Sequence, residues 1–440
     1  MKRVLIITYY WPPSGGSGVQ RWLKMSKYMP EYGWQPVIYT PENAEYPVED
    51  HSLERDITPE AEIIRRPIFE PYTFYKRLIG AKKSQKVKIG FVNEEGRKGG
   101  WKQDLSLWIR GNLFIPDARC HWVRPSVRFL KEYLKAHPVD ALISTGPPHS
   151  MHLIAMELHN ELGIPWVADF RDPWTEIDYY NEFHLTKRSD RKHHQMEHEV
   201  LSTADEVVTV ADDGARRLER IGGRCVKTIY NGFDNEDASQ ASCSQLPDKF
   251  TITYIGNLTK PQNPENLWAA IRELTEENEL FKSRLAIRLI GQIDNSAVHS
   301  IRQNHLDDYV ETRPYIPHDE AIKAQRSATL LLLLLMHDDV PRSKGLLTGK
   351  LFEYLYSGRP ILCIGPEDGD AANIISECTA GHTASFSAKA RMKELITEFF
   401  MQYENGALKG CDRESIEKYS RKSLTKDYTE ILNSLIRHEK

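Results

Sequence analysis

The chain has 440 residues, of which 40% are hydrophobic and 27% are charged. This mixture suits folded domains and excludes disordered, collagen-like and coiled-coil proteins. Lysine and arginine together number 58 and aspartate and glutamate 62, which gives a net charge of −4. That balance argues against a chain-wide polyanion binder, so no nucleic-acid partner is expected. The length accommodates two domains of about 200 residues each.

The cysteines and the apolar segments indicate the compartment. The six cysteines include no CxxC pair, so neither a zinc cluster nor a disulfide framework is expected. The first apolar run ends at Pro12 and is shorter than the apolar core of a signal peptide. The longest aliphatic run, residues 330–336, is far shorter than the roughly 20 residues that span a bilayer. We therefore expect a cytoplasmic protein.

Short aliphatic segments alternate with helical patterns through the first half of the chain. The chain opens with a strand, a glycine-containing loop and a helix on which Val19, Trp22 and Leu23 share one face. Later segments repeat this alternation, which is typical of a doubly wound parallel sheet. The predicted strands are 4–7, 36–39, 141–144, 166–168 and 206–210.

The same pattern restarts after a polar stretch at 235–249 and ends in a long amphipathic helix. The predicted strands of this half are 251–255, 285–290, 329–336 and 360–364. We predict an α/β protein with two Rossmann-like, doubly wound domains. The predicted boundaries are 1–235 for the first domain, 236–415 for the second and 416–440 for the final helix.

A basic segment interrupts the first domain at about 72–104. It holds nine lysines and arginines against three acidic residues, together with several glycines. This composition predicts an inserted loop with a local positive charge.

The loop after the first strand contains Gly15 and Gly16, followed by another glycine at position 18. Glycines there let backbone N–H groups approach a phosphate or a sugar at the start of a helix. A tight turn explains the same residues without any ligand. The spacing is not GxGxxG, so a dinucleotide fingerprint is absent.

Two further segments follow strands, where ligands bind in open α/β sheets. His149 follows the strand at 141–144 and is able to hydrogen-bond a sugar hydroxyl or move a proton. Arg171, Asp172 and Trp174 follow the next strand, with Asp169 just before them. The alternatives are a histidine that merely caps the next helix and an Arg–Asp pair that fixes its own loop.

Lys350 and Glu353 stand three residues apart in a predicted helix that starts near Gly349, so they share one helix face. A lysine at a helix start suits a phosphate, and a glutamate one turn further suits the two hydroxyls of a ribose. The alternative is an exposed Lys–Glu pair, which contributes little.

No metal site or hydrolase motif is expected. His184, His193, His194 and His198 lie in a charged segment without an HExxH pattern, so a solvated helix face is the better interpretation. Neither a GxSxG nucleophile motif nor a Walker A loop is present.

Several of these segments together resemble the GT-B fold glycosyltransferases. The stretch GKLFEYLYSGRPIL at 349–362 resembles the donor-nucleotide motif of the large retaining family that includes sucrose synthase and mannosyltransferases. NGFD at 231–234 and YIGNL at 254–258 resemble the elements that open its second domain. STGPPHS, PWVADFRDPW and IPDARCHW resemble a bacterial subgroup that assembles surface polysaccharides.

The resemblance implies a role for each matching residue. The donor-binding residues would be Glu353 at the ribose and Lys350 at the diphosphate, joined by Gly349, Gly256, Asn257 and Lys260. His149 would contact the transferred sugar, and the catalytic set would be His149, Asp172 and Lys350. Gly15, Gly16, Arg171 and Trp174 would line the acceptor side of the cleft. The position that often carries a first acidic residue in that family is Gly345 here.

The resemblance therefore implies a retaining, metal-independent glycosyltransferase without a cofactor. Its donor would be a nucleotide-diphosphate sugar such as a UDP- or GDP-sugar, and its acceptor a glycan or a lipid-diphosphate. The two domains would face each other across a cleft, and the final helix would cross back to the first domain. Two alternatives remain: a GT-B-fold nucleotide-sugar 2-epimerase, and a non-catalytic nucleotide-binding partner in polysaccharide assembly. For the basic insertion two alternatives stay open: peripheral contact with an anionic membrane, and a solvated loop without a partner.

Overall fold

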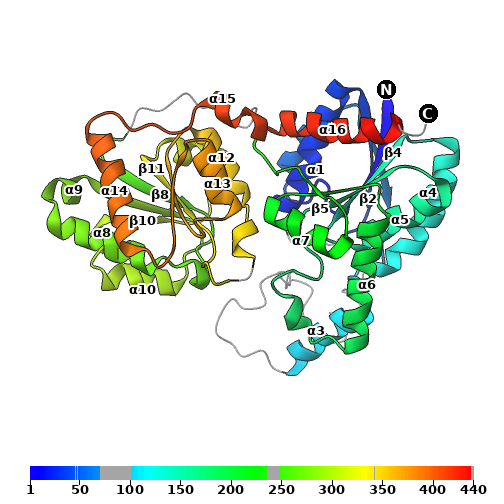
Figure 1. Cartoon of the computed structure of the whole chain (residues 1–440), viewed down its shortest axis with the longest axis horizontal. Coiled ribbons are helices and arrows are strands. Elements are labelled where there is room, and N and C mark those ends of the chain that lie inside the picture. Colours follow the sequence, from blue (N-terminus) through cyan, green and yellow to red (C-terminus); the bar gives the residue numbers. More distant parts are fainter. Residues whose placement is uncertain (45, 47, 70–100, 235–246, 341, 438–440) are drawn as a thin grey trace. The chain divides into compact units, whose positions relative to one another are not determined.

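The computed structural model describes residues 1–44, 46, 48–69, 101–234, 247–340 and 342–437 (Figure 1). The chain forms two compact units. The first unit comprises Met1–Tyr230 and Leu424–Lys440, and the second comprises Asn231–Ser423. The predicted boundaries were 235/236 and 415/416, so the observed division comes five residues earlier at the first boundary and eight later at the second (235 − 230 and 423 − 415).

The first unit is built on a seven-stranded parallel sheet with the order β3-β2-β1-β4-β5-β6-β7. The strand order reverses between β1 and β4, which creates the topological switch point where ligands of such sheets bind. The five predicted strands of this half correspond to β1, β2, β4, β5 and β6. The bounds are β1 Lys2–Ile7, β2 Trp34–Pro41, β3 Glu62–Arg66, β4 Ala141–Gly146, β5 Trp166–Phe170, β6 Glu206–Thr209 and β7 Lys227–Thr228.

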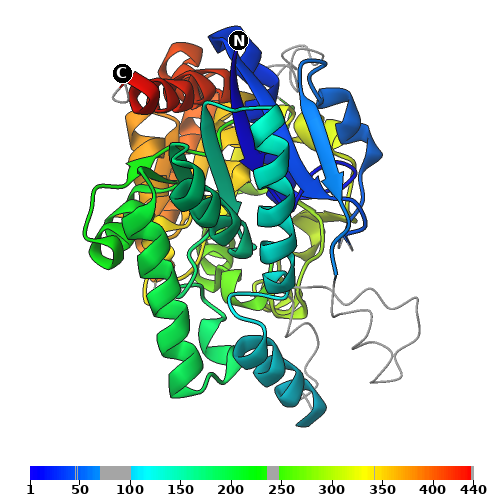
Figure 2. The ribbon, with the colours of Figure 1, turned by 90° about the vertical axis from the view of Figure 1, so that its right-hand side faces the viewer.

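Both faces of this sheet are covered by helices (Figures 1 and 2). Side chains alternate along a strand, so Leu5 and Ile7 join one hydrophobic core while Val4 and Ile6 join the other. Continuous apolar strands are the signature of a sheet buried on both faces. The helices are α1 Ser17–Tyr28, α3 Trp101–Leu113, α4 Val123–Ala136, α5 Ser150–Leu162, α6 Lys187–Thr203, α7 Asp212–Gly222 and α16 Arg421–Arg437, with short 3-10 turns at Met29–Tyr32, His51–Asp56, Cys120–Trp122 and Tyr180–Phe183.

The last helix, α16, packs on the first unit as predicted, but it is shorter than expected. Tyr428 lies edge-on to Trp22 of α1, with ring centres 5.1 Å apart, and Leu424 and Leu432 join the same core. The predicted helix at 416–436 is broken before α16, because the hydroxyl of Ser420 accepts the N–H of Ser423 at 3.1 Å and caps the new helix.

The second unit repeats the architecture with a six-stranded parallel sheet in the order β10-β9-β8-β11-β12-β13. The reversal lies between β8 and β11. The strands are β8 Phe250–Ile255, β9 Leu285–Ile290, β10 Val310–Arg313, β11 Leu330–Leu334, β12 Ile361–Ile364 and β13 Gly381–Ala384. The helices are α8 Glu265–Glu277, α9 Glu279–Arg284, α10 Asn295–Gln303, α11 His318–Arg326, α12 Gly349–Ser357, α13 Asp370–Glu377, α14 Lys389–Glu404 and α15 Arg413–Ile416, with short 3-10 turns at Lys260–Gln262, Asp307–Tyr309, Ser343–Gly345 and Glu417–Tyr419.

Two predicted segments fall largely outside the described residues. They are the basic insertion at 72–104, of which residues 101–104 form the start of α3, and the polar stretch at 235–249, of which 247–249 are described.

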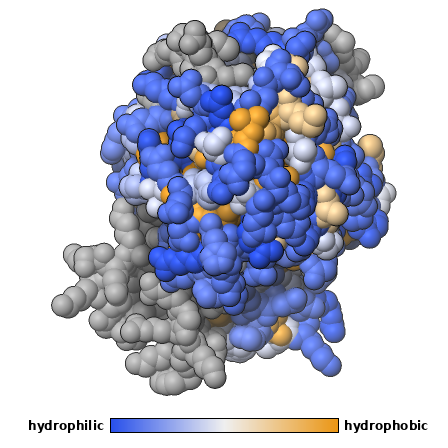
Figure 3. Space-filling model, turned by 90° about the vertical axis from the view of Figure 1, so that its left-hand side faces the viewer, coloured by the Kyte–Doolittle hydropathy of each residue, from blue (hydrophilic) through white to orange (hydrophobic). Residues whose placement is uncertain are grey.

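The exposed side chains of one face of the molecule are coloured by hydropathy in Figure 3. The face turned to the viewer in Figure 3 is mostly hydrophilic, with apolar side chains confined to small areas. Within the described part of the chain, no helix is both long enough and apolar enough to cross a membrane.

Candidate functional site

The loop between β1 and α1 brings Gly15 and Gly16 to the carboxyl edge of the first sheet. Gly15 donates its N–H to the Val48 carbonyl at 2.8 Å, and a side chain at Gly15 would lie 3.1 Å from Val48. Gly16 is exposed and precedes α1 with a φ of +84°, a conformation that glycine adopts without strain. Packing thus explains Gly15, whereas Gly16 leaves the start of α1 accessible to a ligand.

Arg171 joins this loop to the end of β5. Its Nη1 donates to the Gly18 carbonyl at 2.7 Å, and a side chain at Gly18 would lie 3.1 Å from that nitrogen. The side chain of Arg171 is 13% exposed and that of Asp172 is 47% exposed, with 3.5 Å between their charged groups. The structure therefore brings Gly16, Arg171 and Asp172 together at one edge of the first sheet.

Asp169, two residues before Arg171, is buried inside the first unit. Its carboxylate is fully buried and accepts hydrogen bonds from Arg21, at 2.8 and 3.1 Å, from the indole of Trp22 at 2.8 Å and from the Thr145 hydroxyl at 3.0 Å. Arg21 also donates to the Ile229 carbonyl at 2.8 Å. A buried carboxylate needs such partners, so Asp169 ties α1, β4 and β5 to one another.

Trp174 is buried rather than exposed at the edge, which corrects the expectation that it lines an acceptor cleft. Its ring is 3% exposed and stacks on His149 with 4.8 Å between ring centres and 5° between planes. Its indole N–H donates to His193 Nδ1 at 3.1 Å, and His193 Nε2 donates to the Gly111 carbonyl at 3.3 Å. Trp174 therefore supports His149 from behind and connects it to α6 and α3.

His149 is likewise buried, at 7% exposure. Desolvation by burial, assisted by the positive charges of neighbouring groups, holds the pKa of His149 well below its ordinary value. Burial also lowers the pKa of His152 to about 3. A side chain at Gly146 would lie 2.7 Å from His149 Nδ1 and 2.6 Å from His152 Nε2, so the missing Cβ makes room for both rings. His149 is therefore a neutral, packed imidazole. It stands at the N-cap of α5, but its side chain makes no capping hydrogen bond, so the helix-capping alternative does not describe it.

The three histidines of α6 differ in exposure. His194 and His198 are exposed, as predicted, whereas His193 is buried at 5% exposure and helps to hold Trp174. The interpretation of the whole segment as a solvated face was thus wrong for His193, because its neighbour Trp174, in the loop after β5, could not be identified from the spacing of the histidines. Among the described residues, no three His, Cys, Asp or Glu side chains are grouped to hold a metal ion.

Asp117 and Arg119 lie in the IPDARCHW segment and were not singled out by the sequence. Asp117 accepts the N–H and the hydroxyl of Ser150, both at 2.8 Å, at the start of α5. Arg119 donates to the Tyr9 hydroxyl at 2.8 Å and lies over the ring of that tyrosine. Both residues fix the loops after β1 and β4. The signal available in the sequence was an aspartate and an arginine within the IPDARCHW segment.

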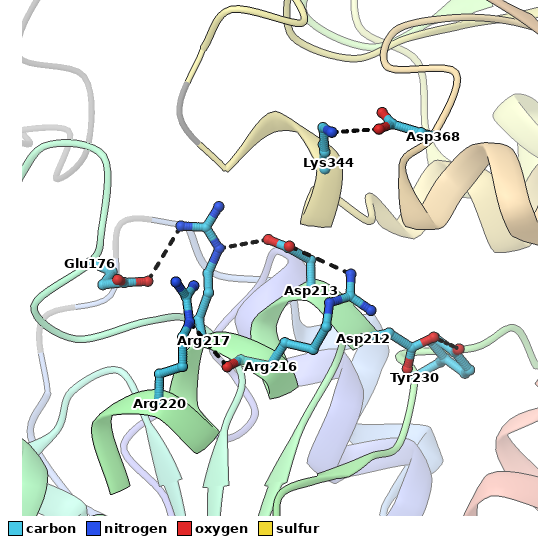
Figure 4. Close-up of polar contacts among 9 residues, drawn as sticks. All are labelled: Glu176, Asp212, Asp213, Arg216, Arg217, Arg220, Tyr230, Lys344 and Asp368. Atoms are coloured by element: carbon cyan, nitrogen blue, oxygen red, sulfur yellow. Dashed lines mark hydrogen bonds and ion pairs between the residues drawn. The ribbon is translucent and has the colours of Figure 1, made fainter. Parts of the chain in front are cut away.

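Another network at this edge begins on α7 (Figure 4). Arg217 donates to Asp213 at 2.6 Å and lies 3.5 Å from Glu176, which follows β5. The Tyr230 hydroxyl donates to Asp212 at 2.9 Å. The i, i+4 spacing of Asp213 and Arg217 was the sequence signal for this pair. The network ties the loop after β5 to α7.

In the second unit, the ammonium of Lys350 lies at the carboxyl end of β8. Its Nζ donates to the Tyr254 hydroxyl at 3.2 Å and lies 4.7 Å from the centre of that ring. The Tyr254 hydroxyl donates onward to the Asn257 carbonyl at 2.8 Å. A side chain at Gly256, whose φ is +138°, would lie 2.7 Å from Nζ. The backbone after β8 is therefore shaped around this ammonium.

Burial lowers the pKa of Lys350 to about 8, although Glu353 acts in the opposite direction. An ammonium has three N–H donors, and among the described residues Tyr254 is its hydrogen-bond partner. Donors thus remain for an anion. This arrangement differs from the solvated Lys–Glu pair that was the alternative prediction.

Glu353 has a different partner from Lys350. Its Oε2 accepts the Nε2–H of Gln325 on α11 at 2.9 Å, and Gln325 is 2% exposed. Glu353 itself is half-buried. A buried amide that holds one carboxylate oxygen fixes the orientation of the other, so Glu353 is held in place by α11.

The remaining predicted donor residues lie around the same edge. Gly349 is the exposed first residue of α12, with open space where a Cβ would stand. Asn257 and Lys260 are exposed in the loop after β8. The positive charge of Lys260 helps to lower the pKa of Asp294, behind larger contributions from Ser296.

Lys344 is engaged by an acidic side chain. It forms an ion pair with Asp368, which follows β12 (Figure 4). Gly369 packs on the Lys344 carbonyl, where an added Cβ would lie 2.9 Å away. Lys344 therefore joins the loops after β11 and β12, and its charge is balanced within the second unit.

No protein-family model matches the chain, and no curated protein matches it in sequence. Solved structures do match, and the following three each share 12% identity with the chain. A sucrose-phosphate synthase from Thermosynechococcus elongatus has a TM-score of 0.61 with 100% of both chains covered. A glycosyltransferase from Rickettsia africae has 0.60, with 99% of this chain and 98% of that chain covered.

Anabaena HepE, whose structure is a complex with UDP-glucose, has a TM-score of 0.57 with 99% of this chain and all of that chain covered. The sheet orders of the two units and the match along the whole chain confirm the predicted fold. The chain has the GT-B fold, with two Rossmann-like units and a last helix that packs on the first unit.

Proposed function

We propose that the chain is a glycosyltransferase that takes a sugar from a nucleotide-diphosphate donor bound to the second unit. The proposal is supported by the fold, which is shared with a sucrose-phosphate synthase, a glycosyltransferase and a protein bound to UDP-glucose. Fold alone does not define an activity. The proposal therefore rests on the residues at the carboxyl edge of the second sheet.

The observation that carries the proposal is the ammonium of Lys350. It is half-buried at the switch point of the sheet, in a space that Gly256 leaves open, and it keeps donors beyond its bond to Tyr254 among the described residues. A desolvated cation gains from an anion that replaces its lost hydration. The proposed partner is the diphosphate, whose negative charge grows as the glycosidic bond breaks.

Glu353 is the proposed ribose ligand. Gln325 occupies its Oε2, and the second oxygen is proposed to accept a hydrogen bond from a ribose hydroxyl. Gly349, Gly256 and Asn257 would supply backbone contacts, and Lys260 would add positive charge near the phosphates.

The first unit is proposed to hold the acceptor at the edge that carries Gly16, Arg171 and Asp172. His149 and Trp174 are proposed to act behind this edge as a packed support, since both are buried. No protein nucleophile is assigned, in keeping with a retaining reaction in which the acceptor attacks the donor directly.

The acceptor is proposed to be a glycan or a lipid-diphosphate, and the protein to work in the cytoplasm at the inner face of a membrane. The basic insertion at 72–104 is the contact proposed from the sequence. Anionic lipids attract such segments with about 1 kcal/mol per basic residue near the surface.

The proposal is tested first by ligand-induced stabilisation, because a ligand that binds the native state alone raises the unfolding temperature. We expect one nucleoside diphosphate among UDP, GDP, ADP and TDP to raise it more than its nucleoside does. Release of that diphosphate from the matching nucleotide sugar should persist in excess EDTA. Absence of stabilisation by all four, or a loss of turnover in EDTA that added metal restores, would contradict the proposal.

A further inference from the structure

One end of the first unit combines exposed apolar side chains with exposed basic ones. Helix α3 and the first two turns of α6 lie together at the lower end of this unit in Figures 1 and 2. We name this region the α3/α6 surface and define it by Leu105, Trp108 and Leu113 on α3 and Lys187, Arg188, Arg191 and Lys192 on α6.

Direct contacts join α3 to the segment that leads into α6. Gly111 of α3 packs so closely on Phe183 and Leu185 that an added Cβ would lie 2.7 and 2.5 Å from their side chains. Asn112 Oδ1 accepts the N–H of Thr186, the residue before α6, at 2.7 Å. The exposed side of α3 and the start of α6 therefore belong to one rigid surface.

Helix α3 has apolar residues on two opposite sides. Leu107 and Gly111 are buried against the rest of the unit. Leu105, Trp108 and Leu113 are instead 46%, 38% and 63% exposed. At about 100° per residue, Leu105 and Leu113 lie opposite the buried pair and Trp108 lies on the flank between them. A helix that only packs on its own unit needs one apolar stripe, so these exposed apolar side chains suit an external partner.

The basic residues on α6 are equally unexplained by folding. All four are exposed, and among the described residues none of them forms an ion pair. Lys187 and Arg188 stand in the first turn of α6, where the macrodipole disfavours positive charge. The one acidic residue among them, Asp190, accepts a hydrogen bond from the Tyr180 hydroxyl at 3.0 Å and lies 3.4 Å from His194.

We propose that the α3/α6 surface binds an anionic lipid bilayer. Leucine and tryptophan side chains enter the boundary between headgroups and acyl chains, while lysine and arginine remain at the anionic headgroups. An acidic protein would match the charges, but it would not require exposed leucine and tryptophan side chains beside them. The proposal deepens that of a lipid-linked acceptor and rests on it for its biological role. Lipid binding itself needs no sugar transfer, so the two proposals fail separately.

The test is co-sedimentation of the full chain with vesicles of phosphatidylcholine, with and without phosphatidylglycerol, at low and high salt. We expect binding to the anionic vesicles that weakens at high salt. A charge variant replaces Lys187, Arg188, Arg191 and Lys192 with glutamine. An apolar variant replaces Leu105, Trp108 and Leu113 with serine. Each variant should lower the partition coefficient by at least about tenfold.

Matched controls come from exposed residues of the same kinds elsewhere. The basic control replaces Lys249, Lys323, Lys409 and Lys426 with glutamine, and the apolar control replaces Leu280 and Met401, which are 49% and 58% exposed, with serine. Both controls should bind as the unchanged protein does. The charge variant alters only exposed side chains, so it remains informative if the apolar variant fails to fold.

Three results would overturn the proposal. The first is an unchanged protein that does not sediment with anionic vesicles. The second is a charge variant that binds them as well as the unchanged protein. The third is an apolar variant that keeps lipid binding but changes from oligomer to monomer, which would assign the surface to a second copy of the chain.

Discussion

Lys350 of α12 donates a hydrogen bond to Tyr254 of β8 at 3.2 Å, and Tyr254 donates onward to the Asn257 carbonyl. A residue of the first strand in the second sheet thus sets the position of an ammonium that comes from a helix far along the chain. Because the same tyrosine also fixes the loop that follows β8, the cation and the loop that would surround a ligand are held as one piece.

Lys350→Ala should separate phosphate recognition from base recognition. If the ammonium binds the diphosphate, affinity for the nucleoside diphosphate falls by at least about tenfold, which corresponds to 1.4 kcal/mol, whereas affinity for the bare nucleoside stays within about twofold. Calorimetry with nucleoside, monophosphate and diphosphate measures both. Lys323→Ala, an exposed lysine of the same unit, is the control. An equal effect on all three ligands would show that phosphate is not the partner.

Lys350→Met should stabilise the ligand-free protein near pH 7. The folded-state pKa of about 8 lies below the ~10.4 of an unfolded lysine, so the unfolded chain binds this proton more tightly. The loss of unfolding free energy caused by burying the charged Lys350 is complete below about pH 8 and disappears as the pH rises towards ~10.4. We expect the unfolding temperature to rise by about 2–4 °C at pH 7 and the difference to shrink above pH 10. A destabilised variant at pH 7 would contradict this.

Glu353→Gln tests the proposed ribose contact. The variant keeps the size of the side chain, and its amide oxygen still accepts the hydrogen bond from Gln325. It loses the negative charge, which weakens charge-assisted hydrogen bonds worth roughly 1.5–3 kcal/mol. Affinity for nucleoside and nucleoside diphosphate should fall together by about tenfold or more. Deoxyribose analogues, which lack one hydroxyl, should lose less from the substitution than ribose compounds do. Glu394→Gln, on the exposed side of α14, serves as the control.

His152 should make the protein lose stability in mild acid. Its folded pKa of about 3 lies below the ~6.5 of an unfolded histidine, so between these values the unfolded chain binds more protons and stability falls as the pH falls. The loss approaches 1.4 kcal/mol per pH unit below about pH 6. His152→Asn should flatten the slope of unfolding free energy between pH 6 and pH 4.5, roughly the range below the unfolded pKa. His194→Asn, at an exposed position, should leave the slope unchanged. If unfolding free energy depends on pH equally in the unchanged protein and in both variants, His152 is not the source of the acid sensitivity.

Asp169→Asn should destabilise the first unit strongly. The substitution leaves the buried guanidinium of Arg21 without its counter-charge, and breaking one partner of a buried pair costs about 3–5 kcal/mol. Glu161→Gln, which breaks the more exposed pair with Lys131, should cost about 0–1 kcal/mol. Chemical unfolding followed by circular dichroism compares the two. Similar losses of unfolding free energy in the two variants would mean that burial does not make the Asp169–Arg21 pair more important than an exposed pair.

The sequence by itself determined the central strands of both sheets and therefore the fold. The segments that became β1 and β11 contain continuous aliphatic runs, because a strand buried on both faces has no polar side to show, and those that became β4 and β8 add small hydroxyl residues and aromatic residues to aliphatic ones. Edge strands such as β3 and β10 were not predicted. They are half-exposed and carry charged residues, so their composition resembles that of a loop.

The spacing of Lys350 and Glu353 likewise predicted their common helix, because helix geometry is local. Their partners, Tyr254 and Gln325, come from distant elements and could be known only from the folded chain. The first unit shows the same limit. Charge and aromatic content gave Asp169, Arg171, Asp172 and Trp174 one common role, and the tertiary structure divided them.

Asp169 and Trp174 point into the core, where Arg21 and His193 receive them, while Asp172 stays at the surface. Asp169 lies within β5, whereas Arg171, Asp172 and Trp174 follow it in a loop, so which of these side chains is buried depends on the helices packed there. Local chemistry therefore identified the edge of the sheet that carries polar side chains. Long-range packing decided which of those side chains remain free to meet a ligand.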